Sequence, residues 1–151
     1  WNACVKTFHA DAITFEFPTR YDFIISNPPF YENELKSPND KKNAAMHDTS
    51  LTLAALLSII SDNLTPSGSF GILLPYYRKD YFKNIAMQAG FGVIEELEVK
   101  QTPHHAPFRS ILHFGKSKFA EYTPKELTIK GDSNDYTPEF ITLLKDYYLA
   151  F

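Results

Sequence analysis

The sequence predicts one α/β domain with a mostly parallel sheet and an antiparallel edge near its carboxyl end. Continuous apolar runs, which suit strands buried on both faces, alternate along the chain with patterns of helical periodicity. Two strand-like segments then follow each other without an intervening helix, which favours an antiparallel pair. With 151 residues, 44% of them hydrophobic, the chain has the length and composition of a single domain with a packed core.

In the first half, Cys4–His9 alternates β-branched and aromatic residues with others, which predicts a short strand. Tyr21–Ser26 is a continuous apolar run typical of a central parallel strand. Thr49 or Ser50 can cap a helix that runs to about Asn63 on a stripe of leucine and isoleucine.

In the second half, the turn signal Pro66–Gly68 precedes further elements. The pattern predicts a buried strand ended by Pro75, a helix closed by Gly90 and two final strands: Ser69–Leu74, Arg78–Ala89, Val93–Lys100 and Ser110–Lys116. A tail follows, and we expect its aromatic residues Phe140, Tyr147, Tyr148 and Phe151 to pack back on the domain.

Charge and cysteine content exclude several classes of protein. The formal net charge of −3 gives no global basic signature, so a nucleic-acid partner would have to meet a local patch. Cys4 is the single cysteine, which excludes an internal disulfide framework and fits a reducing cytoplasm. The apolar stretches are far shorter than the roughly 20 residues that a membrane span needs.

The strongest candidate site is the segment Asn27-Pro28-Pro29-Phe30, directly after the second predicted strand. Ligands of open α/β sheets bind beyond the carboxyl ends of strands. Pro28 and Pro29 fix φ near about −65° and restrain the residue before each of them, so Asn27 keeps little freedom. Neither proline has an N–H group, so their carbonyl groups are acceptors without a local donor.

This segment suits a planar amine such as the exocyclic amino group of adenine. The Asn27 side-chain oxygen can accept one N–H and the Pro28 carbonyl oxygen the other. Both bonds favour a pyramidal nitrogen whose lone pair can attack a methyl sulfonium, and fixed acceptors contribute about 3 to 4 kcal/mol each by analogy with oxyanion donors. Phe30 can stack on a base turned out of its helix or loop. The alternative interpretation is a turn that only ends a strand.

The run from Tyr21 to Phe30 resembles the fourth motif of class I S-adenosylmethionine (SAM)-dependent amino-methyltransferases. More specifically, the whole chain resembles bacterial enzymes that methylate N6 of adenine 37 in valine tRNA. The matching features are Ser37-Pro38 with the polar stretch to His47, Pro107-Phe108-Arg109, Leu127–Gly131, Asn134–Thr137 and Tyr147-Tyr148. At Phe30 tyrosine is commoner in such enzymes; phenylalanine keeps the stacking face and lacks the hydroxyl.

The resemblance implies a partial Rossmann-like class I methyltransferase fold, SAM as cofactor and tRNA as partner. Asp11 matches the acidic position after the third strand of such enzymes, which accepts the cofactor's adenine amine, and Asn27 would also contact the cofactor. Lys36, Lys41, Lys42 and Arg109 are candidates for binding tRNA. A solvated loop explains the lysines equally well, and a carboxylate is the alternative partner of Arg109. The adjacent His104 and His105 point apart on an extended chain, so we predict no metal site.

Class I methyltransferases bind SAM mainly through a glycine-rich loop after their first strand. The only G-x-G here, Gly90–Gly92, follows a helix and lacks a third glycine, which indicates a turn. We therefore expect residues 1–151 to be the C-terminal catalytic portion of one methyltransferase domain, without its first strands and cofactor loop. Alone, these residues should bind SAM weakly or not at all.

Other functions remain open at this point. Glutamine methyltransferases of release factors use the same turn on a side-chain amide, although the Leu127–Gly131 ending favours the tRNA group. DNA adenine methyltransferases usually add a target-recognition region, and none is seen. A non-catalytic fragment that binds RNA or protein is the alternative outside enzymes.

Two further groups have simple structural interpretations. Glu95, Glu96 and Glu98 form an acidic stretch, which most simply indicates a solvated edge. Tyr76 and Tyr77 follow Pro75 near the expected substrate side, and packing in the core or at the rim of the domain is the preferred interpretation of their role.

Overall fold

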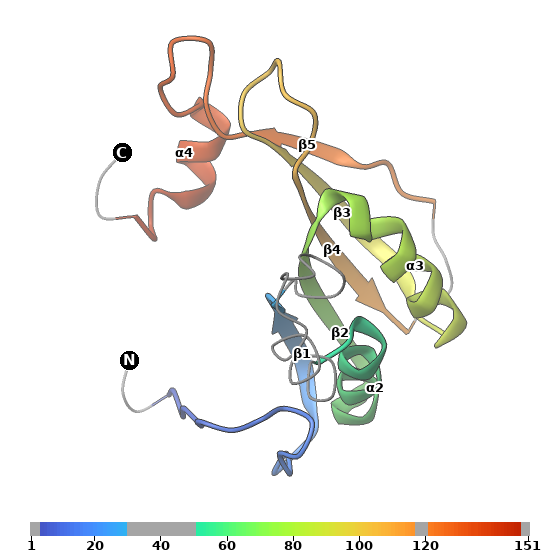
Figure 1. Ribbon diagram of the computed structural model, residues 1–151. Helices are drawn as coiled ribbons and strands as arrows, with labels where there is room; N and C mark the ends of the chain where they lie inside the picture. Colours follow the sequence, from blue (N-terminus) through green and yellow to red (C-terminus); the bar gives the residue numbers. More distant parts are fainter. Residues whose placement is uncertain (1–3, 30–50, 117–120, 149–151) are drawn as a thin grey trace, which may run out of the picture.

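The computed structural model describes residues 4–29, 51–116 and 121–148, which form one five-stranded sheet with helices (Figure 1). The α/β class predicted from the sequence is confirmed. The elements in chain order are β1 Tyr21–Ser26, α2 Leu53–Asn63, β2 Leu64–Pro75, η1 Tyr76–Arg78, α3 Lys79–Gln88, β3 Gly92–Lys100, β4 Arg109–Gly115, β5 Lys125–Thr128 and α4 Pro138–Leu144.

The strands lie in the order β1-β2-β4-β3-β5. β1 is parallel to β2 and β3 to β5, while β4 is antiparallel to both of its neighbours. The predicted antiparallel pairing of β3 and β4 is thus confirmed. The prediction that this pair forms the edge of the sheet is wrong, because β4 lies between β2 and β3 and because β5 lies outside β3. The sequence predicted a mostly parallel sheet, whereas the described strands make two parallel and two antiparallel pairings.

The core lies between the sheet and the helices α2 and α3, which cover one face of it (Figure 1). Phe70 of β2 is fully buried at its centre, where its ring stacks on Phe114 of β4 with centroids 4.9 Å apart. Phe82 of α3 meets both rings edge-on. Apolar burial of this kind is the main term that holds a sheet to its helices.

The opposite face of the sheet is covered only in part by the described residues. α4 lies there beside β5, with Phe140 buried (Figure 1). Towards the other end of the sheet, Phe23 and Ile25 of β1 and Ile111 of β4 are exposed. None of the helices in the described ranges is long and apolar enough to cross a membrane.

Three local predictions differ from the structure. Cys4–His9 is not a strand; a strand needs a hydrogen-bonded neighbour, and here the ring of Phe8 packs on Phe15 at 5.2 Å instead. Thr49 and Ser50 lie outside the described residues, and the helix begins after Thr52, whose hydroxyl accepts the Ala55 N–H at 3.1 Å.

The third difference is the predicted turn at Pro66–Gly68, which lies inside β2 rather than before it. Tyr21 of β1 pairs with Leu64 of β2, and Phe23 pairs with Ser69, so β2 contains extra residues between these two pairs. The turn residues therefore form an irregularity within the strand, and pairing with β1 resumes at Ser69.

Gly90 ends α3 as predicted and has a φ of +85°. An added Cβ would meet nothing within 4 Å, so replacement by alanine tests the backbone conformation alone. We expect Gly90→Ala to lower the free energy of unfolding by about 1 to 2 kcal/mol, the cost of a left-handed residue. Gly131→Ala is the control, because its site is equally open and its φ is not in that region. Equal urea midpoints for the two variants would contradict this explanation.

Candidate active site

The Asn27–Pro29 turn leaves β1 at the carboxyl edge of the sheet. Ser26 is the register partner of Ile72, so the turn emerges beside the last residues of the parallel strand β2. Pro28 is buried, whereas Asn27 and Pro29 are exposed. The buried proline anchors the turn, and the amide side chain of Asn27 can be reached from solvent.

Two further segments reach the same edge. β2 ends at Pro75 and continues into η1, and Pro75 pairs with Arg109 at the start of β4. The Tyr76 N–H donates to the Phe108 carbonyl oxygen at 3.0 Å, which extends the pairing past the sheet. The Asn27 turn, η1 and the Phe108–Arg109 segment therefore lie in a row on three successive strands.

A buried charge cluster lies between β3 and α3, the helix that follows η1. Lys79, the first residue of α3, donates to Glu96 Oε1 at 2.8 Å and also to Glu98. Lys83 and the Tyr122 hydroxyl donate to Glu96 Oε2 at 3.1 and 2.9 Å. Glu96 is 1% exposed, so the predicted solvated acidic edge is wrong for this residue, whose side chain faces α3.

The hydrogen bonds of this cluster decide the charge states of its members. Burial alone would raise the pKa of Glu96, but hydrogen bonds from Lys79, Lys83 and Tyr122 outweigh it and lower that pKa. Burial would likewise lower the pKa of Lys79, but its hydrogen bonds to Glu96 and Glu98 raise that pKa instead. Both groups are held in their charged forms.

Asp11 forms a local turn. Its Oδ1 accepts the Ile13 N–H at 3.0 Å, its carbonyl oxygen accepts the Phe15 N–H at 2.9 Å, and its side chain is exposed. Within the described residues no hydrogen bond or ion pair joins Asp11 to Asn27. Their chain neighbours Ala12 and Ser26 line one pocket, and the cofactor roles of Asp11 and Asn27 stay predictions.

The other predicted residues divide into two groups. Phe30, Lys36, Lys41 and Lys42 lie outside the described residues. Arg109 is described and stands in the row at the site, with its guanidinium carbon 5.9 Å from the centroid of the Phe108 ring. His104 contacts Asp132 at 3.1 Å, and across the described ranges no group of three or more His, Cys, Asp or Glu could hold a metal ion.

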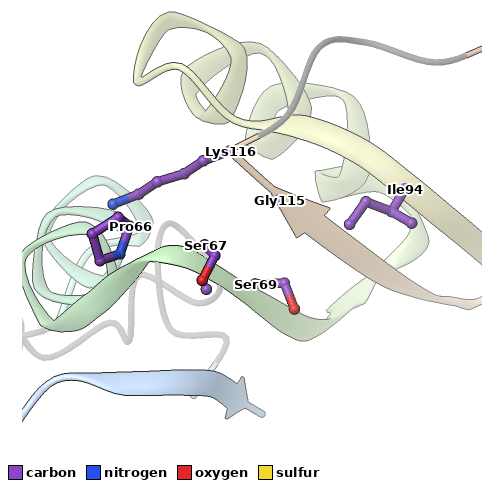
Figure 2. A pocket seen from close by; sticks show the side chains of 7 residues that line it. Pro66, Ser67, Ser69, Ile94, Gly115 and Lys116 are labelled. Atoms are coloured by element: carbon purple, nitrogen blue, oxygen red, sulfur yellow. The ribbon is translucent and has the colours of Figure 1, made fainter.

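A cavity of about 380 Å³ lies at the opposite edge of the sheet (Figure 2). Ser67, Ser69 and Lys116 contribute its polar groups. Ser69 pairs with Gly115, six residues along β4 from the Arg109 that pairs with Pro75. Because six residues of a strand span about 20 Å, this cavity is separate from the Asn27 turn.

Comparison with solved structures identifies the fold. A predicted O-methyltransferase from Agrobacterium tumefaciens aligns over 87% of this chain and 53% of its own length, with a TM-score of 0.62 and 16% identity. The M1.HpyAVI–SAM complex aligns over 81% of this chain and 65% of its own, with a TM-score of 0.50 and 16% identity. The chain therefore has the Rossmann-like fold of class I methyltransferases, as its sequence predicted.

The sequence comparison is more specific. No protein-family model matches. The tRNA1(Val) (adenine(37)-N6)-methyltransferase of Dyadobacter fermentans is 35% identical over 97% of this chain, and that of Proteus mirabilis is 29% identical over all of it. The chain covers 62% of the length of each of these relatives. It is thus a relative of the tRNA1(Val) methyltransferases over nearly its whole length, and the resemblance found in its motifs is confirmed.

Two features of this site go beyond what the sequence predicted. Tyr77 is 59% exposed, so of the two places expected for it, the core and the rim, the core is excluded. The buried Lys79–Glu96 pair was missed, although a lysine at a predicted helix start and a glutamate in the following strand were both visible in the sequence.

Proposed function

We propose that this chain is the acceptor-side portion of a SAM-dependent enzyme that methylates N6 of adenine in tRNA, at position 37 of valine tRNA. The observation that carries the proposal is the anchored turn at the carboxyl edge, in which Pro28 is buried and Asn27 is exposed. The substrate is taken from the names of the relatives. Their alignments with this chain extend over nearly all of it. We place the reaction in the cytoplasm, which suits a chain with one cysteine.

In this proposal the Asn27 side-chain oxygen and the Pro28 carbonyl oxygen accept the two N–H groups of the target amine. The nitrogen would become pyramidal, and its lone pair would form the new bond to the methyl carbon while the carbon–sulfur bond of the sulfonium breaks and its electron pair stays on sulfur. The amine loses its extra proton to water after the transfer, so no side chain has to act as a general base. Phe30 stacks on the adenine, and Lys36, Lys41, Lys42 and Arg109 contact the phosphates.

The residues present fit one side of a SAM site. SAM supplies an electrophilic methyl group. Asp11 has an exposed carboxylate that keeps lone pairs beyond the Ile13 contact, so it can accept an N–H from the cofactor's adenine. Asn27 stands at the edge where such a cofactor would meet the target. We propose that further cofactor contacts come from the part of the relatives' length that this chain does not cover.

The test compares acceptors for methyl transfer from radiolabelled SAM by the intact protein. We expect valine tRNA that lacks the modification to be methylated, and the same tRNA with guanine at position 37 to remain unlabelled. A release factor is the third acceptor, because its glutamine amide could occupy the same turn. Label on the release factor and none on tRNA would overturn the proposal and establish the glutamine reaction instead.

A further inference from the structure

We infer that Tyr77 and Arg78 of η1 form a stacking platform for an RNA nucleotide next to the target adenine. The inference rests on the proposed function and adds a specificity-determining contact to it. The platform directly follows β2, the strand that pairs with β1, so it would contact RNA that flanks the target rather than the target itself.

The exposure and contacts of Tyr77 suit stacking. The residue is 59% exposed although it stands between a buried strand end and a helix. The guanidinium carbon of Arg78 lies 5.7 Å from the ring centroid, within the range of a cation–π contact. An aromatic ring bordered by a guanidinium offers a flat face to a base and a positive charge to its phosphate.

A second pair of the same kind lies next to the platform. Phe108 is 43% exposed, and the Arg109 guanidinium carbon is 5.9 Å from its ring centroid. The hydrogen bond from Tyr76 to Phe108 fixes the two segments side by side. Two aromatic–arginine pairs on neighbouring segments favour single-stranded RNA, such as a loop with unstacked bases, over a protein partner.

The buried cluster holds the platform in position. Lys79 Nζ lies 4.3 Å from the centroid of the Tyr76 ring, while its ion pairs with Glu96 and Glu98 tie it to β3. The residues on both sides of Tyr77 and Arg78 are therefore anchored: Tyr76 by Phe108, and Lys79 by the two glutamates. A platform fixed in this way loses little conformational entropy when RNA binds.

The experiment measures binding of unmodified valine tRNA to the intact protein, and its methylation. We expect Tyr77→Ala to weaken RNA binding by about 5- to 150-fold, the range for loss of one base–aromatic stack. The kcat at saturating tRNA should change little, so the loss should appear in KM. Tyr77→Phe should restore binding, because the ring and not the hydroxyl does the stacking.

Tyr81→Ala is the matched control. Tyr81 is also an exposed tyrosine, one helical turn further along the chain on α3, and its replacement should leave RNA affinity unchanged.

A second, spectroscopic experiment places 2-aminopurine at each nucleotide adjacent to adenine 37. We expect the wild type to quench the fluorescence at one of these positions and Tyr77→Ala to lose that quenching.

The outcomes separate this inference from the proposed function. If the wild type methylates tRNA while Tyr77→Ala binds it equally well, the platform is wrong and the proposed function stands. A loss that Tyr81→Ala shares would also overturn the platform, since it would report a general change of the surface. If the wild type has no affinity for tRNA, both proposals fail.

Discussion

Replacement of Asn27 by alanine should lower the kcat for tRNA methylation by about 100- to 1000-fold, as loss of one preorganised electrostatic group does in other enzymes. The side-chain oxygen of Asn27 accepts one N–H of the target amine in the proposed reaction. That bond strengthens as the nitrogen becomes positively charged, so its loss should affect the transition state more than binding. Binding of tRNA should therefore persist, which can be measured with the same variant.

Two further variants make this test specific to the acceptor. Asn27→Asp keeps an acceptor oxygen at the same place in nearly the same volume, so it should retain more activity than Asn27→Ala. Asn84→Ala removes an exposed asparagine from α3 and should leave the kcat unchanged. Full activity of Asn27→Ala would exclude the catalytic role and favour a chain that only binds RNA or protein.

The parts of the fold that sequence predicted best are those with strong local signals. Tyr21–Ser26 is β1 without change of bounds, but the prediction of a central strand buried on both faces is wrong for the described sheet, in which β1 is at the edge and Phe23 and Ile25 are exposed. α3 ends where Gly90 can adopt a positive φ. In contrast, β5 has four residues and α4 has seven, too few for periodicity to separate them from a tail. The order of β4 and β3 depends on pairing between distant residues, which no local pattern encodes.

The same distinction applies to the candidate site. The Asn27 turn could be located because two prolines and a strand end are adjacent in the chain. The platform at Tyr77 could not, because its exposure depends on how β2, η1 and β4 pack together. Glu96 shows the limit most clearly: Glu95 directly before it is exposed, and only the packing of α3 and Tyr122 makes the Glu96 carboxylate a buried group.

Replacement of Glu96 by alanine should lower the free energy of unfolding by about 3 to 5 kcal/mol, the usual cost of removing one partner from a buried ion pair. Lys83 would lose its buried carboxylate partner and Lys79 would keep only Glu98. Glu95→Ala is the matched control on the same strand. Its exposed pair with Lys125, at 3.2 Å, should contribute no more than about 1 kcal/mol. Urea unfolding of both variants measures the difference.

The pH dependence of the Glu96→Ala effect identifies its origin. Because the fold lowers the pKa of Glu96, the carboxylate contributes stability above the pKa of an unfolded glutamate, about 4.3. That contribution is lost as the pH falls from there through the lower pKa of the folded state. The stability difference between wild type and Glu96→Ala should therefore be full at neutral pH and shrink in acid. A difference that stays constant down to acid pH would mean that lost packing, not the ion pair, destabilises the variant.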